Sequence, residues 1–380
     1  MSLRQASKSR LLKETVFDVK FSKAIEIGEV KVRLVWFDSL GAKSSCILVE
    51  TPDVKVLVDP GVAEMQPSYP LSWDEKLRLR DEAFNAILEA SKQADVITVS
   101  HYHYDHHTLP SEAPALYAGK KLLIKDPNTW INGSQWDRAR LFLDELHRVL
   151  GGGGLEELLI EPSSLEVKDP LSELPLASSK DYGDYGTRKR ELLLKGKKWF
   201  EGLVEDWRSK PWVREFKLSG VEVYFADGKS FHYGSTELKF SKPLFHGLEY
   251  DKLGWVLMLT VKHRGVKVVH SSDLQGPVIE DYAEMIIAER PDLVVLDGPP
   301  TYLFGYTLNR INLKRAEENA KRIAEESGAK LIIYDHHLLR DRLYKHRLEG
   351  LYSSVSSSKL MTAAEWLGEQ PLILKVAGEV

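Results

Sequence analysis

The chain has 380 residues, of which 43% are hydrophobic and 28% are charged, as is typical of a globular protein with a sizeable core. Its longest apolar stretches are far shorter than the roughly 20 residues of a membrane-spanning helix, so we expect no membrane partner. The formal net charge of −4 disfavours a nucleic-acid-coating protein, because duplex-binding domains carry a basic excess. A single cysteine, Cys46, excludes an internal disulfide framework and a cysteine-cluster metal site.

The N-terminal arm, residues 1–12, carries three basic residues but no apolar core of the kind that a signal peptide has. We interpret it as a solvated arm. Without an export signal, and with only one cysteine, the chain is expected to be cytoplasmic. The sequence carries no signal for the oligomeric state.

The first part of the chain predicts strands followed by an outer helix. Val30–Phe37, Ser45–Glu50 and Val54–Asp59 are β-branched or apolar, and their short links predict an antiparallel meander. Apolar residues recur at helical spacing over Asp74–Lys92. This helix leads into Asp95–Ser100, whose sequence DVITVS is typical of a buried strand.

Residues 127–217 differ from their surroundings, because they hold five tryptophans and two helical patterns, at Asp137–Leu150 and Arg188–Arg208. We predict a helical insertion here, within a single domain formed by residues 1–380. The second helix is rich in basic residues. Such a run is usually a solvated helix face, and the alternative is a set of substrate-binding cations: Arg188, Lys189 and Arg190.

The second half of the chain repeats the pattern of strands and helices. Strands are predicted at Trp255–Val261, Val266–His270, Leu293–Leu296 and Leu331–Tyr334. Helices are predicted between them, at Val278–Arg290 and Asn312–Ser327. Two β-rich halves with helices outside indicate an α/β architecture in which sheets are sandwiched between helices.

A dense group of metal-binding side chains directly follows the strand DVITVS: His101, His103, Asp105, His106 and His107. Imidazole and carboxylate are the ligands that borderline divalent ions such as zinc prefer. If the strand persists, His101 and His103 project the same way, while Asp105 and His106 turn toward a neighbouring position. One short segment therefore offers ligands to two ions. An unstructured polar tract is the weaker interpretation, because the group is internal and follows a core strand.

The segment 101–106, HYHYDH, resembles the His-x-His-x-Asp-His hallmark of the metallo-β-lactamase superfamily, in which an earlier strand ends in an aspartate, here Asp59. The later ligands of that family follow in order, at His246, Asp273 and His336. The whole is most similar to the large, mainly archaeal branch of predicted metal-dependent hydrolases. The resemblance implies a four-layer αββα sandwich, which the helical insertion interrupts.

The resemblance also implies two divalent metal ions, with zinc favoured and iron or manganese as alternatives. It assigns His101, His103 and His246 to one ion, Asp105, His106 and His336 to the other, and Asp273 to both. His232 competes with His246, but Pro243 and Gly247 fit a ligand-bearing loop better. His337 is the alternative to His336, because neighbouring strand residues point to opposite faces and the strand ends close to both.

Three further residues receive expected roles. Asp59 is expected to accept the second N–H of a ligating histidine and so orient the ring, with a turn residue as the alternative. Asp297 and Tyr302 are expected to line the substrate mouth, and a structural turn explains them equally well.

The implied chemistry is hydrolysis. Two adjacent ions lower the pKa of a water and polarise a carbonyl or phosphoryl oxygen, and Asp105 can hold that water and take its proton. The leading hypothesis is an esterase or phosphodiesterase that acts on a small-molecule ester or phosphoester. The alternatives are a nuclease that cuts RNA or DNA, which is not favoured, and a metal-stabilised scaffold or binding protein without activity.

Overall fold

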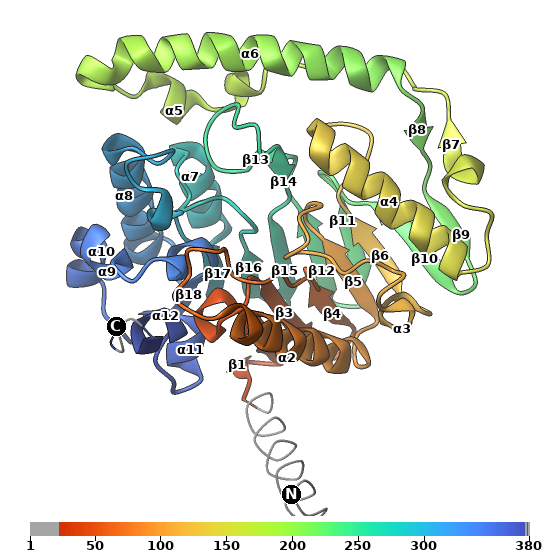
Figure 1. Ribbon diagram of the computed structural model, residues 1–380, viewed down its shortest axis with the longest axis horizontal. Helices are drawn as coiled ribbons and strands as arrows, with labels where there is room; N and C mark the ends of the chain where they lie inside the picture. The colour runs from red at the N-terminus through yellow and green to blue at the C-terminus, as the bar shows by residue number, and fades with distance from the viewer. Residues whose placement is uncertain (1–22, 377, 379–380) are drawn as a thin grey trace, which may run out of the picture.

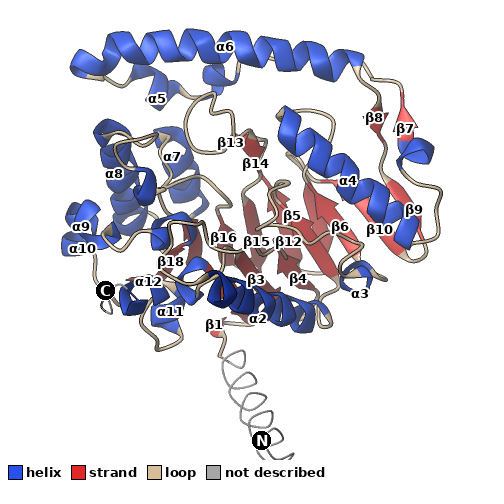
Figure 2. Ribbon diagram, viewed as in Figure 1, coloured by secondary structure: helices blue, strands red, loops and turns tan. Residues whose placement is uncertain are grey.

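The computed structural model describes residues 23–376 and residue 378, so the N-terminal arm expected from the sequence lies outside the described residues. Two mixed sheets occupy the centre, and helices cover their outer faces (Figures 1 and 2). The first sheet has the strand order β1 (Ile25–Ile27), β2 (Val30–Phe37), β3 (Ser45–Glu50), β4 (Lys55–Val58), β5 (Val96–Val99), β6 (Lys121–Ile124), β10 (Val221–Phe225) and β9 (Phe216–Leu218).

The second sheet has the order β11 (Ser230–Tyr233), β12 (Thr236–Phe240), β15 (Leu259–His263), β16 (Val266–His270), β17 (Leu293–Asp297), β18 (Leu331–Asp335) and β19 (Leu360–Met361). Both sheets follow the same plan. An antiparallel meander, β1 to β4 or β11 to β16, continues into parallel strands reached through crossovers. Two-stranded ladders form between β13 (Leu244–Phe245) and β14 (Trp255–Val256), and between β7 (Leu159–Ile160) and β8 (Trp212–Val213).

Alternation along the central strands creates the four layers. In β3, Ile47 and Val49 join the core between the two sheets, while Cys46 and Leu48 face the other way, toward the helices. Val268 of β16 belongs to the inner core and Val269 to the outer one. Each sheet is thus apolar on both faces and requires a partner on each. The predicted αββα sandwich is confirmed.

The outer layers are formed by α2 (Trp73–Ser91), α3 (Pro114–Tyr117), α4 (Gly133–Val149), α5 (Pro175–Ser179), α6 (Gly186–Ser209), α7 (Glu280–Glu289), α8 (Arg310–Glu326), α9 (Tyr344–Arg347), α10 (Glu349–Ser354), α11 (Ala363–Trp366) and α12 (Leu372–Val376). Ser72 precedes helix α2 as its N-cap and forms a capping box with Glu75, which satisfies free N–H groups of the first turn. Its buried stripe, including Ala83 and Ile87, packs on the first sheet.

One predicted strand is wrong in its extent. The run Trp255–Val261 is divided into β14, which pairs with β13, and β15, which pairs with β12 and β16. Between them, the N–H of Leu257 donates to the carbonyl of Ser100 in the loop after β5, 3.1 Å away. The chain leaves the second sheet here because it bonds to a loop of the first.

The predicted insertion range, residues 127–217, is not uniform in its packing. Phe142 and Leu143 of α4 are fully buried in the outer core, so α4 covers the first sheet as α2 does. Helix α6 instead runs across the top of the molecule, above the ends of both sheets (Figure 1). It is held there by Phe200 and Trp207, which pack around Trp255.

A buried ion network fixes the N-terminal half of α6. Glu249, in the loop after β13, lies 2.5 Å from the ammonium of Lys189 and 2.9 Å from Arg315 of α8. Arg315 also pairs with Glu280 of α7 at 2.8 Å. Burial alone raises the pKa of Glu249, but Arg315 and Lys189 outweigh it and lower that pKa to about 2.

This network predicts an acid-sensitive contribution to stability. Because the pKa of Glu249 is depressed on folding, its contribution is complete above about pH 5 and is lost as the pH falls toward 2. Glu249→Gln, which leaves two buried cations without their carboxylate, is expected to lower the free energy of unfolding by about 3–5 kcal/mol at pH 7. Its stability should also vary less between pH 5 and pH 3. Urea unfolding across this range measures both effects, and Glu191→Gln, from an exposed pair with Arg188, is the control. Parallel acid profiles for the wild type and Glu249→Gln would contradict the prediction.

Candidate metal centre

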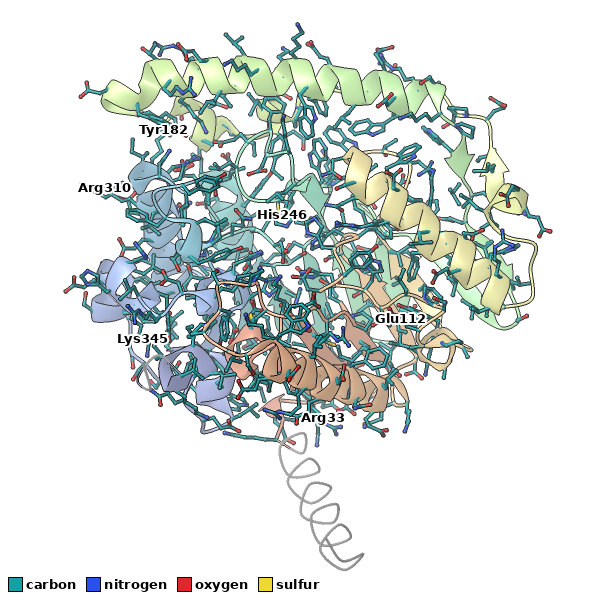
Figure 3. All side chains as sticks on the ribbon, in the orientation of Figure 1. Arg33, Glu112, Tyr182, His246, Arg310 and Lys345 are labelled. Atoms are coloured by element: carbon teal, nitrogen blue, oxygen red, sulfur yellow. The ribbon has the colours of Figure 1, made fainter. Side chains whose placement is uncertain are left out.

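The cluster lies where the parallel strands of both sheets end. The segment 101–106 follows β5, Asp273 follows β16, and His336 follows β18. His246 comes from the second sheet's side, directly after β13, and Figure 3 shows it near the middle of the molecule, below α6. Carboxyl ends of parallel strands meet at one edge of a sheet, so two face-to-face sheets bring their loops to a common point.

The structure brings all seven sequence-predicted ligands together. Within the described residues, two groups each place one ligand atom per residue within 4.8 Å of one another. The first group is His101, His103, His246 and Asp273, and the second is Asp105, His106 and His336. Asp273 touches both groups, with Oδ2 at 3.1 Å from Nε2 of His246 and Oδ1 at 3.1 Å from Nε2 of His106.

The spacing and protonation of the ring nitrogens suit coordination of a metal ion better than hydrogen bonds between the rings. Nδ1 of His106 lies 2.9 Å from Asp59, and Nδ1 of His336 lies 2.8 Å from Asp38. Carboxylates only accept, so both Nδ1 atoms carry a proton, and each ring presents a lone pair at Nε2 once it is in the neutral form that coordinates a metal. These two Nε2 atoms face each other at 3.3 Å. Ligands of one tetrahedral ion are separated by about 3.3–3.4 Å, given metal–ligand bonds of roughly 2.0–2.1 Å.

Unpaired atoms support the same interpretation. Nε2 of His246 and both carboxylate oxygens of Asp273 are buried and have no hydrogen-bond partner among the described residues. A buried carboxylate without hydrogen bonds is costly unless a cation compensates it. The residues present therefore suit divalent metal ions, although the structure does not define their identity or number.

Electrostatics divide the cluster into two halves. Burial, reinforced by His106, lowers the pKa of His101 to about 4, so this ring stays in the neutral form that coordinates metals. Burial also lowers the pKa of His106, but the carboxylates of Asp273 and Asp59 outweigh it and raise that pKa to about 10. The carboxylates around His106 thus favour a positive charge at this ring, and a bound metal ion would supply that charge in place of a proton.

Both candidates for the last histidine face the cluster. The strand ends at Asp335, and His336 adopts a left-handed backbone with φ of 68°, so the alternation of strand side chains does not apply. Nε2 of His336 lies 3.4 Å from Asp273, and Nε2 of His337 lies 4.0 Å from it. A third possible metal-holding group consists of Asp273, His336 and His337.

The other sequence candidates fall at different places. Asp59 is fully buried and contacts His106, as its expected orienting role requires. Asp297 is also buried and lies 2.8 Å from Nδ1 of His337. Burial and the nearby Asp273 raise the pKa of Asp297 to about 8. Tyr302 is half-buried, with its ring centre 5.9 Å from the guanidinium of Arg340.

The basic residues of α6 are not brought to the cluster by any described contact. Arg188 pairs with Glu191, and Arg190 bonds to Thr187 in its own helix. Lys189 is buried against Glu249, so its charge is engaged in the network that fixes α6.

Sequence reasoning missed a group of charged residues beside His336. Asp38, directly after β2, accepts from His336 and lies 2.5 Å from Nε of Arg340. Nη2 of Arg340 is 3.4 Å from Asp105. Two signals could have found them. Asp38 ends a strand just as Asp59 does, and Arg340 follows His336 by four residues.

The chain is similar to proteins of known sequence along most of its length. Residues 39–147 match the model of the beta-lactamase superfamily domain, and this match agrees with the two helix-flanked sheets. A UPF0282 protein of Methanopyrus kandleri is 37% identical, over 89% of this chain and 94% of its own length. A second, from Methanocaldococcus jannaschii, is 36% identical over 89% of this chain and 91% of its own. The chain belongs to the UPF0282 family.

Solved structures give a weaker likeness. The metallo-beta-lactamase fold protein YhfI of Bacillus subtilis matches with a TM-score of 0.40 and 13% identity, over 88% of this chain and 95% of its own. The family assignment rests on the sequence relatives. Among the described residues, no helix has the length and hydrophobicity needed to cross a membrane.

Proposed function

We propose that this protein is a metal-dependent hydrolase that cleaves a small-molecule ester or phosphoester. The observation that supports it most is the buried pair of His/Asp groups bridged by Asp273, with donor atoms spaced as ligands of common ions. When bound, two divalent ions would lower the pKa of a water and stabilise charge on the ester's oxygen. Zinc suits these nitrogen and oxygen donors, and iron or manganese is the alternative.

The chain's own residues orient the metal-binding histidines and hold the water. Asp59 and Asp38 fix the tautomers of His106 and His336 by accepting from Nδ1, which directs each Nε2 inward. Asp105 is the most exposed carboxylate of the cluster, and its side chain retains 14% of its exposure. Burial raises the pKa of Asp105, but His106, His336 and Arg340 hold it well below the usual range. Asp105 therefore stays ionised, and its oxygen can accept a proton or hydrogen bond from water.

Positive charge beside Asp105 favours a substrate that carries a negative charge. Arg340 lies 3.4 Å from Asp105. Lys43 lies near both residues, and its burial together with the positive charge of Arg340 lowers the pKa of its ammonium. No described carboxylate forms an ion pair with Lys43, so its ammonium is free for a ligand. A phosphoester suits this pair of cations better than a neutral carboxylic ester does.

Lys43→Ala is expected to raise the KM for a phosphodiester by roughly tenfold or more, the value of one charge-assisted hydrogen bond. The KM for a neutral carboxylic ester should change little, because that substrate offers no charge to the ammonium. Steady-state kinetics with both substrates measure this split. Lys92→Ala, which removes an exposed lysine paired with Glu89, is the matched control. Equal effects on both substrates would remove Lys43 from charge recognition.

The hydrolase proposal is tested with the full chain loaded with zinc, iron or manganese in turn. Activated phosphodiesters, phosphotriesters and carboxylic esters form the panel, with labelled RNA and DNA beside them. We expect turnover of small esters and none of nucleic acid. Cleavage of RNA or DNA alone would establish a nuclease instead. No turnover by protein with a full complement of metal would favour a metal-stabilised scaffold.

A further inference from the structure

His337 has no place in the family pattern, because His336 already stands where the last ligand of that pattern falls. Its ring nevertheless lies beside the cluster, with its centre 4.4 Å from the centre of the His336 ring. Nε2 of His337 lies 4.0 Å from Oδ2 of Asp273. The ligand atoms of His337, His336 and Asp273 all lie within 4.8 Å of one another. His337 is therefore positioned as a metal ligand would be, in addition to the seven ligands that the pattern assigns.

An aspartate contacts this ring in the way that aspartates contact two of the assigned ligands. Nδ1 of His337 lies 2.8 Å from Oδ1 of Asp297. The corresponding contacts at 2.9 and 2.8 Å are those of His106 with Asp59 and of His336 with Asp38. All three aspartates lie at the carboxyl end of a strand, since Asp297 is the last residue of β17 and the other two directly follow β4 and β2. A carboxylate at Nδ1 leaves the Nε2 lone pair for a metal ion.

Asp297 is itself held by the loop that carries Asp273. Its Oδ2 accepts from the backbone N–H of Gln275 at 2.8 Å, and its own N–H donates to the hydroxyl of Ser271 at 3.0 Å. Both partners lie within two residues of Asp273 in the sequence. The loop that supplies the shared carboxylate therefore also fixes the aspartate that orients His337.

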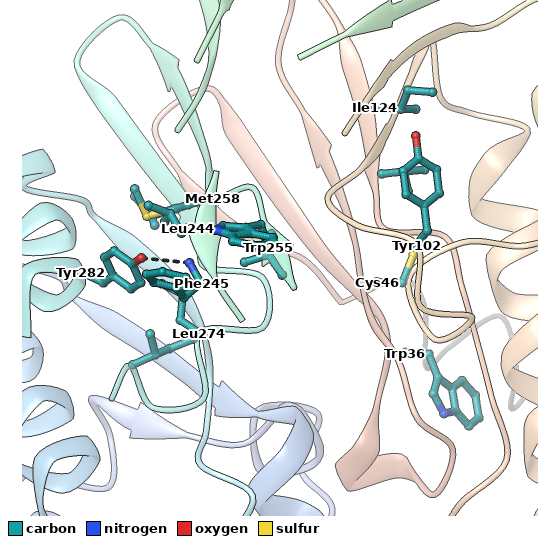
Figure 4. Close-up of a cluster of buried hydrophobic side chains, with 14 of the residues drawn as sticks. Trp36, Cys46, Tyr102, Ile124, Leu244, Phe245, Trp255, Met258, Leu274 and Tyr282 are labelled. Atoms are coloured by element: carbon teal, nitrogen blue, oxygen red, sulfur yellow. Dashed lines mark hydrogen bonds between the residues drawn. The ribbon is translucent and has the colours of Figure 1, made fainter. Parts of the chain in front are cut away.

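The first metal-holding group is complete without His337. It has four members, the number of a tetrahedral zinc site: His101, His103, His246 and Asp273. His246 is held from two sides. The N–H of the preceding Phe245 donates to the Tyr282 hydroxyl at 2.9 Å (Figure 4), and Nε2 of Gln275 lies 3.3 Å from Nδ1 of His246. This group needs no further imidazole.

The second group shares a residue with His337. Its own members are Asp105, His106 and His336, and His336 also belongs to the group that contains His337. The side chains of Asp105 and His337 retain 14% and 9% of their exposure, whereas that of His336 retains 1%. His337 therefore approaches the second group from its more open side, where Asp105 also lies.

We propose that His337 is an additional ligand of the second metal ion and that Asp297 is its positioning residue. This inference rests on the proposed dinuclear centre, and it gives the second ion five protein ligands, with Asp273 shared. Five ligands exceed the four of a tetrahedral zinc site, so iron(II) or manganese, which accept six, suit this position better. The first position keeps the four ligands that suit zinc. The centre is then a mixed one, with zinc in the first group and iron or manganese in the second.

Cobalt(II) titration of the full-length chain, after removal of its metal, tests this inference without any assay of activity. Cobalt(II) absorbs strongly with four ligands and weakly with six, so one bound ion should give an intense band and the other a weak one. His337→Gln keeps a donor for Asp297 but has no imidazole nitrogen. In this variant the ion with the weak band should bind at least about tenfold more weakly, and its band should change in position and intensity. The intense band should stay unchanged.

Elemental analysis tests the choice of metal. Wild-type chain loaded with one equivalent each of zinc and manganese, and then passed through a desalting column, should retain both ions. His337→Gln treated in the same way should retain zinc and lose manganese. A wild type that retains zinc alone would overturn the mixed centre.

Two further variants separate ligation from general structural effects. Asp297→Asn preserves shape but removes the charge at Nδ1 of His337, and should cost the second ion about 10–100-fold in affinity. His346→Gln makes the same change as His337→Gln at an exposed position of α9, outside every metal-holding group, and should bind metal as the wild type does.

Three outcomes would contradict the proposal. Unchanged cobalt binding and absorption in His337→Gln, even with reduced turnover, would overturn the ligand role of His337 and leave the dinuclear centre in place. A change confined to the intense band would assign His337 to the first ion and overturn its place in the second. A wild type that binds one cobalt ion or none would overturn this inference together with the dinuclear centre.

Discussion

Replacement of His246 by alanine is expected to release a metal ion and to lower thermal stability. A ligand that binds only the folded state stabilises it by about 2.7 kcal/mol when its concentration is 100 times its Kd, and this gain disappears with the site. The wild type should hold close to two ions per chain, and His246→Ala fewer. Elemental analysis and thermal unfolding, each with and without a chelator, measure the two effects.

His232→Ala is the matched control, because His232 was the competing candidate and is exposed on β11. Its metal content and melting temperature should equal those of the wild type. The chelator should lower the melting temperature of the wild type and of His232→Ala by more than that of His246→Ala. Loss of metal from His232→Ala, or one ion or none in the wild type, would contradict the dinuclear centre.

Asp105→Asn is expected to reduce kcat by about 10²–10⁴-fold, the usual contribution of a group that accepts a proton in the transition state. The substitution preserves shape but removes the charge that belongs to the second group of ligands. Metal content should fall toward one ion per chain. Kinetics on the best ester of the panel, together with elemental analysis, test this prediction.

Asp59→Asn provides the graded comparison. Asp59 accepts from His106 and Ser100 and belongs to none of the metal-holding groups, so its substitution should cost about 10–100-fold in metal affinity or activity. A variant of Asp105 that turns over like the wild type would rule out a catalytic role for this carboxylate. An Asp59 variant as impaired as Asp105→Asn would show that orientation of His106 dominates.

The strands and helices around the cluster were predictable because their patterns are local. Strands β2, β3 and β16 have the predicted bounds, and each alternates between the two cores. The strand Trp255–Val261 was mispredicted because its division depends on a bond between Leu257 and Ser100, which are far apart in sequence. No periodicity encodes such a bond.

The candidate site shows the same limit. The ligands at 101–106 were evident from spacing, and the family pattern located His246, Asp273 and His336. Periodicity failed at His336, because a left-handed backbone turns two adjacent histidines toward one carboxylate. Lys43 and Arg340 carried no motif, since their position beside Asp105 depends on contacts between distant segments.

The meeting of two sheets at one cluster also sets the order in which a newly made chain can acquire its metal. The segment 101–106 leaves the ribosome long before His336 does. The hydrogen bond between Asp38 and His336 joins residues that are 298 positions apart in the sequence. Contacts of such sequence separation form late in folding. The first ligand group ends with Asp273 and is complete without β18, whereas the second lacks His336 until β18 docks between its neighbours. Stable binding of a second ion is therefore a marker that the last parallel strands have reached their places.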